Sequence, residues 1–256
     1  MVSIKTKKDI EILREGGKRH ALILNEIANR VTSGIATNEL NDLANTLIAE
    51  GGDTPAFLQF KPYGAKRPYP ASLCVSINDE IVHGIPNEKP KILKEGDIVS
   101  LDLGLMHNGL ITDMAVTIAV GKIGKESKKL LTVTKKSLDA GIKAAKRGNH
   151  VGDIGFAVQS AILPYGFGIV RELSGHGVGH KVHEDPYVPN FGEKGKGEEL
   201  VPGMVIAIEP MVNMGSEKIM LDDDGFTYRT RDGSRSAHFE HTVLITEGDA
   251  EILTKP

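Results

Sequence analysis

Two pairs of carboxylates stand in the same sequence frame in this 256-residue chain. Asp102 and Glu209 each close an apolar run that begins with a glycine six residues earlier. Their partners, Asp113 and Glu240, each open an apolar run that ends with a glycine eight residues later. Burying an ionised carboxylate in an apolar strand is costly unless a metal ion or a counter-charge compensates. Four acids in a repeated frame therefore predict a metal site.

The first pair lies on a predicted hairpin. Asn108-Gly109 is typical of a two-residue turn. A turn there sets residue 104 opposite Asp113 and Asp102 opposite residue 115. Because side chains alternate along a strand, Asp102 and Asp113 would share one face as diagonal neighbours. The alternative, an exposed hairpin with solvated acids, fits poorly with the apolar residues beside them.

Three of the nine histidines lie in sequence contexts that suit a site. His83 ends a short apolar strand at a Gly/Pro turn, and glycines flank His176, which opposes a helix and lets the backbone approach a bound group. His183 follows seven residues later. His176 and His180 are four residues apart, but the glycines between them and the absence of an HExxH glutamate argue against a helical zinc pair, so His180 is given no role. Four carboxylates and one imidazole suit Mn, Fe or Co at least as well as Zn.

The elements that must position these residues also repeat. Segments 34–48 and 148–162 align at an offset of 114, with apolar residues at helical spacing in both. Another helical pattern precedes each segment. The first follows a capping box at Thr6–Asp9, and the second begins at Ser127. We therefore predict one α+β domain, residues 1–256, made of two related halves, about 1–121 and 127–256, with the acids where the halves meet.

Composition narrows the class of protein. The net charge of −3 gives no sign of nucleic-acid binding. Cys74 is the only cysteine, so an internal disulfide is excluded. The N-terminus lacks an apolar signal region, and no apolar run reaches membrane-spanning length. We expect a cytoplasmic protein.

Six motifs follow one another along the chain and together suggest a family. They are Asn78–Pro86, Asp102 with Asp113, Gly175–Gly179, His183–Pro186, Ile208–Met211 and Phe239–Thr242. In this order and spacing they resemble a type I methionine aminopeptidase, essentially from end to end. The resemblance implies the pita-bread α+β fold with internal pseudo-two-fold symmetry, in agreement with the repeat. It excludes the type II branch, because too few residues separate His183 from Glu209 to hold that branch's helical insertion.

The resemblance also implies a metal centre and a reaction. Five residues would coordinate two divalent ions (Co, Mn, Fe or Zn): Asp102, Asp113, His176, Glu209 and Glu240. Asp113 and Glu240 would bridge the ions. The implied reaction removes the initiator methionine from nascent proteins when the second residue is small, by attack of a metal-bridging hydroxide on the first peptide bond. Glu209 would relay the proton, His183 would stabilise the oxyanion, and His83 would contact the substrate beside the scissile bond.

A methionine pocket and partners follow from the same resemblance. The pocket side chains expected are Phe57, Phe60, Tyr69, Cys74 and Phe226. Residues 55–74 form a longer stretch than the common bacterial pattern, and Phe226 stands where the family often has tryptophan. Expected partners are the N-termini of nascent polypeptides, with transient ribosome contact and no nucleic acid or membrane, and the protein is expected to be a monomer.

Three other classes of protein could share some of these features. A proline-specific peptidase of the same fold would carry the same five ligands, but such relatives usually have a large extra N-terminal domain, and here a helix begins at about residue 7. A non-catalytic binding protein of this fold would typically have lost ligands. A metal-dependent phosphoesterase would fit the acids but not the histidine contexts.

Overall fold

Four long helices and three sheets make up the structure, a computed structural model that describes residues 2–256. The helices are α1 (Lys7–Asn29), α2 (Thr37–Glu50), α3 (Lys125–Ala144) and α4 (Val151–Ile162), and a short 3₁₀ turn, η1 (Leu163–Tyr165), follows α4. None of the helices in this described part is long and apolar enough to cross a membrane.

Within residues 2–256, nine strands form the main sheet, in the order β1-β4-β5-β14-β9-β7-β8, with β2 paired to β4 and β15 to β14. Their bounds are β1 (Thr54–Pro55), β2 (Leu73–Ile77), β4 (Ile98–His107), β5 (Leu110–Ala119), β7 (Gly175–Gly177), β8 (Glu184–Val188), β9 (Val205–Ile208), β14 (Glu240–Leu244) and β15 (Glu251–Ile252). A second sheet contains β13 (Ser236–His238), β10 (Met211–Asn213) and β6 (Gly168–Ile169). A third contains β11 (Ile219–Leu221), β12 (Tyr228–Thr230) and β3 (Glu80–Val82).

Local sequence signals explain where two of these elements begin and turn. The Thr6 hydroxyl accepts a hydrogen bond from the Asp9 N–H while the Asp9 carboxylate accepts from the Thr6 N–H, so the predicted capping box is confirmed. Asn108 and Gly109 have φ of 47° and 82°, as a hairpin turn of the I′ type requires. The predicted register is also confirmed, because Gly104 pairs with Asp113 and Asp102 with Ala115.

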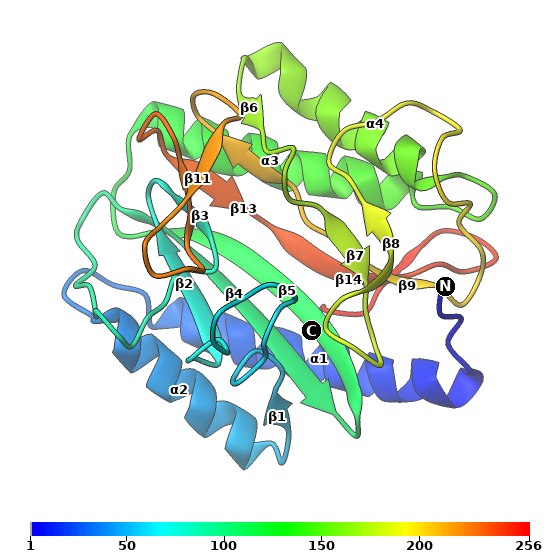
Figure 1. Ribbon diagram of the computed structural model, residues 1–256, viewed down its shortest axis with the longest axis horizontal. Helices are drawn as coiled ribbons and strands as arrows, with labels where there is room; N and C mark the ends of the chain where they lie inside the picture. The colour runs from blue at the N-terminus through cyan, green and yellow to red at the C-terminus, as the bar shows by residue number, and fades with distance from the viewer. Residues whose placement is uncertain (1) are drawn as a thin grey trace.

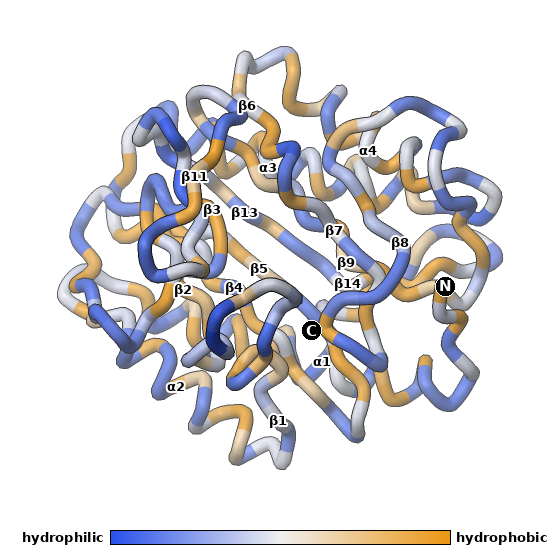
Figure 2. Tube along the Cα trace, viewed as in Figure 1, coloured by the Kyte–Doolittle hydropathy of each residue, from blue (hydrophilic) through white to orange (hydrophobic). Residues whose placement is uncertain are grey.

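The helices cover the strands in two groups, as Figure 1 shows. Helices α1 and α2 pack on β2, β4 and β5, whereas α3 and α4 pack on β8, β9, β10 and β13. Strand β14 lies between β5 and β9 and so joins the strands of the two groups. Along α2 the tube in Figure 2 alternates between hydrophobic and hydrophilic residues, as expected of a helix with one buried face.

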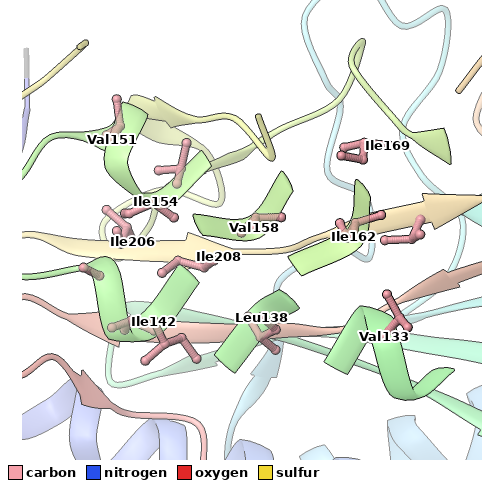
Figure 3. Packing of buried hydrophobic residues seen from close by; sticks show 14 of the residues in the cluster. Val133, Leu138, Ile142, Val151, Ile154, Val158, Ile162, Ile169, Ile206 and Ile208 are labelled. Carbon is pink, nitrogen blue, oxygen red and sulfur yellow. The ribbon is translucent and has the colours of Figure 1, made fainter. Parts of the chain in front are cut away.

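The core beneath α3 and α4 is closely packed (Figure 3). It contains Val133, Leu138 and Ile142 from α3, Val151, Ile154, Val158 and Ile162 from α4, and Ile206 and Ile208 from β9. Gly141 permits the close approach, because a Cβ there would lie 2.8 Å from a Val158 methyl and 3.2 Å from an Ile208 methyl. This packing holds β9, and therefore the residue that follows it, in a fixed position.

Candidate active site

The five predicted ligands come from five neighbouring strands of the main sheet. Asp102 lies on β4, Asp113 on β5, Glu240 opens β14, Glu209 follows β9 directly, and His176 lies on β7. Since β4, β5, β14, β9 and β7 are consecutive in the sheet, the structure brings all five side chains to one region. All four acids and His176 line the same cleft.

His176 is oriented toward the acids. Its Nε2 lies 3.4 Å from Glu209 Oε1 and 4.0 Å from Asp113 Oδ2. Ligand atoms of Asp113, His176 and Glu240 all lie within 4.8 Å of one another. The His176 Nδ1 is 2.9 Å from the Gly177 carbonyl oxygen. In the tautomer that donates this hydrogen bond, Nε2 keeps a free lone pair facing the carboxylates, which is how metal-binding histidines are commonly held.

The surroundings of the four carboxylates indicate whether a cation fits here. Among residues 2–256, Asp102 Oδ1, Asp113 Oδ1 and Glu240 Oε1 are buried and have no hydrogen-bond partner. In that same part of the chain no lysine or arginine pairs with any of the four acids. Buried charges without partners are strongly unfavourable, and divalent cations satisfy them. The residues therefore fit a metal centre.

Burial shifts the proton affinity of the same groups. It raises the pKa of Asp102 to about 7 and that of Glu209 to about 8. Burial, with the neighbouring carboxylates, raises the pKa of Asp113 and of Glu240 well above the usual range. Burial lowers the pKa of His176 to about 3, so its imidazole is neutral and free to coordinate. Without a cation these acids therefore bind protons more tightly than free carboxyl groups do, and a metal ion would compete with those protons.

His83 and His183 lie on the cleft wall beside these acids. His83 directly follows β3 in the left-handed region, with φ of 60°, and its ring lies edge-on to Tyr228 at 5.9 Å. His183 is exposed in the loop between β7 and β8, and its ring centroid is 4.5 Å from that of His176. Both imidazoles therefore line the space that a molecule bound in the cleft would occupy.

Glu184 anchors the loop that carries His183. Its Oε2 accepts a 2.6 Å hydrogen bond from Lys5 Nζ, and both side chains of this ion pair are almost completely buried. Its Oε1 accepts from the backbone N–H groups of His180 and Lys181. His180, for which no role was predicted, has its Nε2 4.0 Å from Asp9 Oδ2. The loop is thus tied to the N-terminal segment.

The cleft has a volume of about 840 Å³ and includes an apolar region beside the acids. All five predicted pocket residues line it: Phe57, Phe60, Tyr69, Cys74 and Phe226. The Tyr69 and Phe226 rings meet edge to face at 5.3 Å, and the Tyr69 hydroxyl donates to the Gly84 carbonyl oxygen. Burial raises the pKa of the Cys74 thiol well above its usual value, so the side chain acts as a small neutral group. Tyr69, Phe226 and Cys74 form one buried apolar cluster.

The sequence-based prediction missed one residue at this centre, His238. Its Nε2 lies 3.6 Å from Glu209 Oε2 and 3.9 Å from Glu240 Oε2. The available signal was strand periodicity: a side chain two residues before Glu240 in an extended segment lies on the same face.

This fold and this cluster of buried donors are those of a metallopeptidase. Residues 11–247 match Metallopeptidase family M24, and the chain belongs to that family. Over its full length it is similar to the methionine aminopeptidase of Clostridium perfringens, at 45% identity covering 99% of both chains. It is 44% identical to methionine aminopeptidase 1 of Bacillus subtilis, covering all of both chains. The implied membership among the methionine aminopeptidases is thereby confirmed.

Solved structures agree on the fold. The methionine aminopeptidase of Thermotoga maritima superimposes with a TM-score of 0.94 at 43% identity, covering all of both chains. The prolidase of Pyrococcus furiosus gives a TM-score of 0.74 at 26% identity, covering 99% of this chain and 65% of the prolidase. The predicted pita-bread fold is therefore confirmed.

Proposed function

We propose that this chain removes the N-terminal methionine from polypeptides whose second residue is small, in a metal-dependent hydrolysis. One observation carries the proposal: five potential ligands from adjacent strands meet beside an apolar slot in a single cleft. The methionine aminopeptidases that match the whole chain support the same reaction.

In this proposal the metal centre holds two divalent ions, which would be Co, Mn, Fe or Zn. Asp102, Asp113, His176, Glu209 and Glu240 would hold them. The unpartnered buried oxygens and the neutral His176 support this ligand set. Divalent ions in such a centre supply Lewis-acid chemistry, because they activate water and polarise a carbonyl oxygen.

The chain's own groups would handle protons and charge. Glu209 lines the cleft beside His176, where its carboxylate could accept a proton from the attacking water and return it to the leaving amine. His183 lies on the cleft wall, where an N–H could donate to the oxygen that becomes negative. His83, on the wall formed by β3, would contact the substrate beside the scissile bond.

The apolar slot would select the first residue. Methionine is unbranched and polarisable, and it suits a narrow space lined by aromatic rings and sulfur. Tyr69, Cys74 and Phe226 supply such a surface, Phe57 packs against them, and the Phe60 ring lies edge-on to His183. The crowding of His83 and the acids around the scissile bond would restrict the second residue to Gly, Ala, Ser and similar types.

The remaining expectations follow from this function. The partners would be nascent N-termini, with transient ribosome contact, and the chain would act as a cytoplasmic monomer. We also propose that residues 1–256 form one catalytic domain of two related halves. The two helix pairs, which pack on different strands joined by β14, support this.

The decisive experiment compares peptides with a metal-reconstituted enzyme. Protein stripped with chelator and reloaded with Mn or Co should cleave Met-Ala-Ser and leave an Ala-Pro-led peptide almost untouched. Preference for Ala-Pro would assign the chain to the proline-specific branch of the fold. Full activity in chelator would contradict the metal mechanism.

A further inference from the structure

His238 is a buried histidine without a hydrogen-bond partner, beside the candidate metal centre. Its side chain is 2% exposed, and neither ring nitrogen has a partner within hydrogen-bond distance in the described range 2–256. Burying a polar group unpaired costs free energy, and native structures contain few such groups. The burial of two ring nitrogens without hydrogen bonds therefore indicates that His238 has a function at this centre.

The geometry around Glu209 indicates that role. Glu209 Oε1 is 3.4 Å from His176 Nε2, and Glu209 Oε2 is 3.6 Å from His238 Nε2. Two imidazoles thus flank one carboxylate, one at each oxygen. The backbone of His238 is held firmly: its N–H donates to Thr117 Oγ1, and the Thr117 hydroxyl donates to the His238 carbonyl oxygen. His238 is not among the residues that line the cleft, so it faces Glu209 from behind.

From this arrangement we infer that His238 is a positioning residue for Glu209, donating its Nε2–H to Oε2, the carboxylate oxygen on the side away from His176. The inference rests on the proposed function, in which Glu209 both coordinates metal and moves a proton. The observed 3.6 Å is slightly longer than a hydrogen bond. Such contacts commonly shorten in the loaded enzyme.

The physical reason for such a residue is orientation. A carboxylate that offers one oxygen to a cation and the other to a proton works only if its plane is fixed. A donor to one lone pair of Oε2 fixes that plane, leaves Oε1, beside His176, for the cation, and leaves the second lone pair of Oε2 for the proton. Partners of metal ligands act in this way in many metalloenzymes.

Three variants test the inference. His238→Gln keeps an N–H donor, His238→Leu keeps the approximate volume without a donor, and His241→Leu is the matched control. His241 is adjacent to Glu240 in the chain, and its Nδ1 is 3.0 Å from the Thr254 hydroxyl. Measurements are kcat and KM on Met-Ala-Ser, metal stoichiometry and affinity by titration calorimetry, and the melting temperature of the chelated protein.

We expect His238→Leu to lower kcat or metal affinity by roughly 10- to 100-fold with unchanged stoichiometry and little change in KM. His238→Gln should restore most of the loss, and His241→Leu should leave kcat and metal affinity unchanged. The chelated His238→Leu protein should melt no lower than wild type, because a matched apolar side chain replaces an unpaired polar one.

Four results would overturn the inference. One is loss of a metal equivalent in His238→Gln and His238→Leu alike, which would make His238 a ligand. The others are unchanged kcat and metal affinity in His238→Leu, failure of Gln to restore either quantity, and a melting temperature lowered equally in both variants. Wild-type protein that binds metal but does not cleave Met-Ala-Ser would instead contradict the proposed function, and the metal-affinity series would still decide the role of His238.

Discussion

Cys74 stands directly opposite Asp102 on the adjacent antiparallel strands β2 and β4. Directly opposed residues point to the same face of a sheet, so the apolar slot and the candidate metal centre share a wall. A substrate side chain seated against Cys74, as we propose, would place the following peptide bond close to the acids. In the proposed function, recognition of the first residue and cleavage after it would both depend on this one pair of strands.

Substrate selectivity should reflect that slot. Norleucine has the length of methionine without sulfur, so Nle-Ala-Ser should be cleaved appreciably, whereas the branched Leu-Ala-Ser should be cleaved poorly. Small changes in an apolar side chain are worth about 1–3 kcal/mol in such a pocket. The measurement is kcat/KM across a series of peptides differing at the first residue. Met-Leu-Ser serves as the control for the second position and should be poor. Equal rates for methionine and leucine would exclude the proposed pocket.

Metal binding should depend on Asp113 and Glu240, the acids on the adjacent strands β5 and β14. Asp113→Ala or Glu240→Ala should abolish tight binding and peptidase activity, because each removes a central carboxylate from a buried cluster. Asp42→Ala, an exposed acid on α2, is the control and should behave as wild type. The check is metal content after dialysis, together with restoration of activity by Co or Mn. Retention of two metal equivalents in Glu240→Ala would be incompatible with this ligand set.

His183 should be separable from the ligands. His183→Ala should bind metal normally while kcat falls by roughly 10²-fold, the scale of losing one oxyanion donor. His183→Gln retains an N–H and should recover part of the rate. Stopped assays with saturating peptide, alongside metal analysis of the same samples, measure both properties. Metal loss from His183→Ala would mean that His183 belongs to the coordination sphere.

Stability of the metal-free protein should fall as pH rises through neutrality. The pKa of Asp102 is raised from 3.8 to about 7 and that of Glu209 from 4.5 to about 8, so the folded state binds more protons than the unfolded chain between these values. This contribution to stability is full below about pH 4 and is lost as pH rises toward 8. Bound metal replaces those protons.

The increase in melting temperature on adding Mn should therefore grow from about pH 5.5 to about pH 8. Scanning calorimetry of chelated and metal-loaded samples at each pH gives the difference between their melting temperatures. The effect of buried histidines away from the centre is nearly the same in both samples, so it largely cancels in this difference. Asp113→Ala should show no such increase. A metal effect that is constant across this range would argue against the raised pKa values.

The parts of the fold and of the candidate site that could be predicted from the sequence are those that depend on neighbouring residues alone. The Asn108-Gly109 turn permits one register, so the pairing of Gly104 with Asp113 follows from the turn alone. The backbone conformation of His83 could not be predicted in this way. Its left-handed φ of 60° depends on long-range contacts of the folded chain, including the hydrogen bond that the Thr227 hydroxyl donates to the His83 carbonyl oxygen. His238 was missed because no glycine frame marks it, and its proximity to Glu209 arises from pairing between β10 and β13.

The buried Lys5–Glu184 ion pair has a consequence for protein engineering. Ser3 lines the cleft, and the Lys5 N–H also bonds to the Gly203 carbonyl oxygen, so the first residues form part of the wall of the cleft. Trimming them would leave the Glu184 carboxylate without its cation and release the loop that carries His183. Affinity tags and immobilisation chemistry are better attached at the other end, where Lys255 and Pro256 are exposed to solvent.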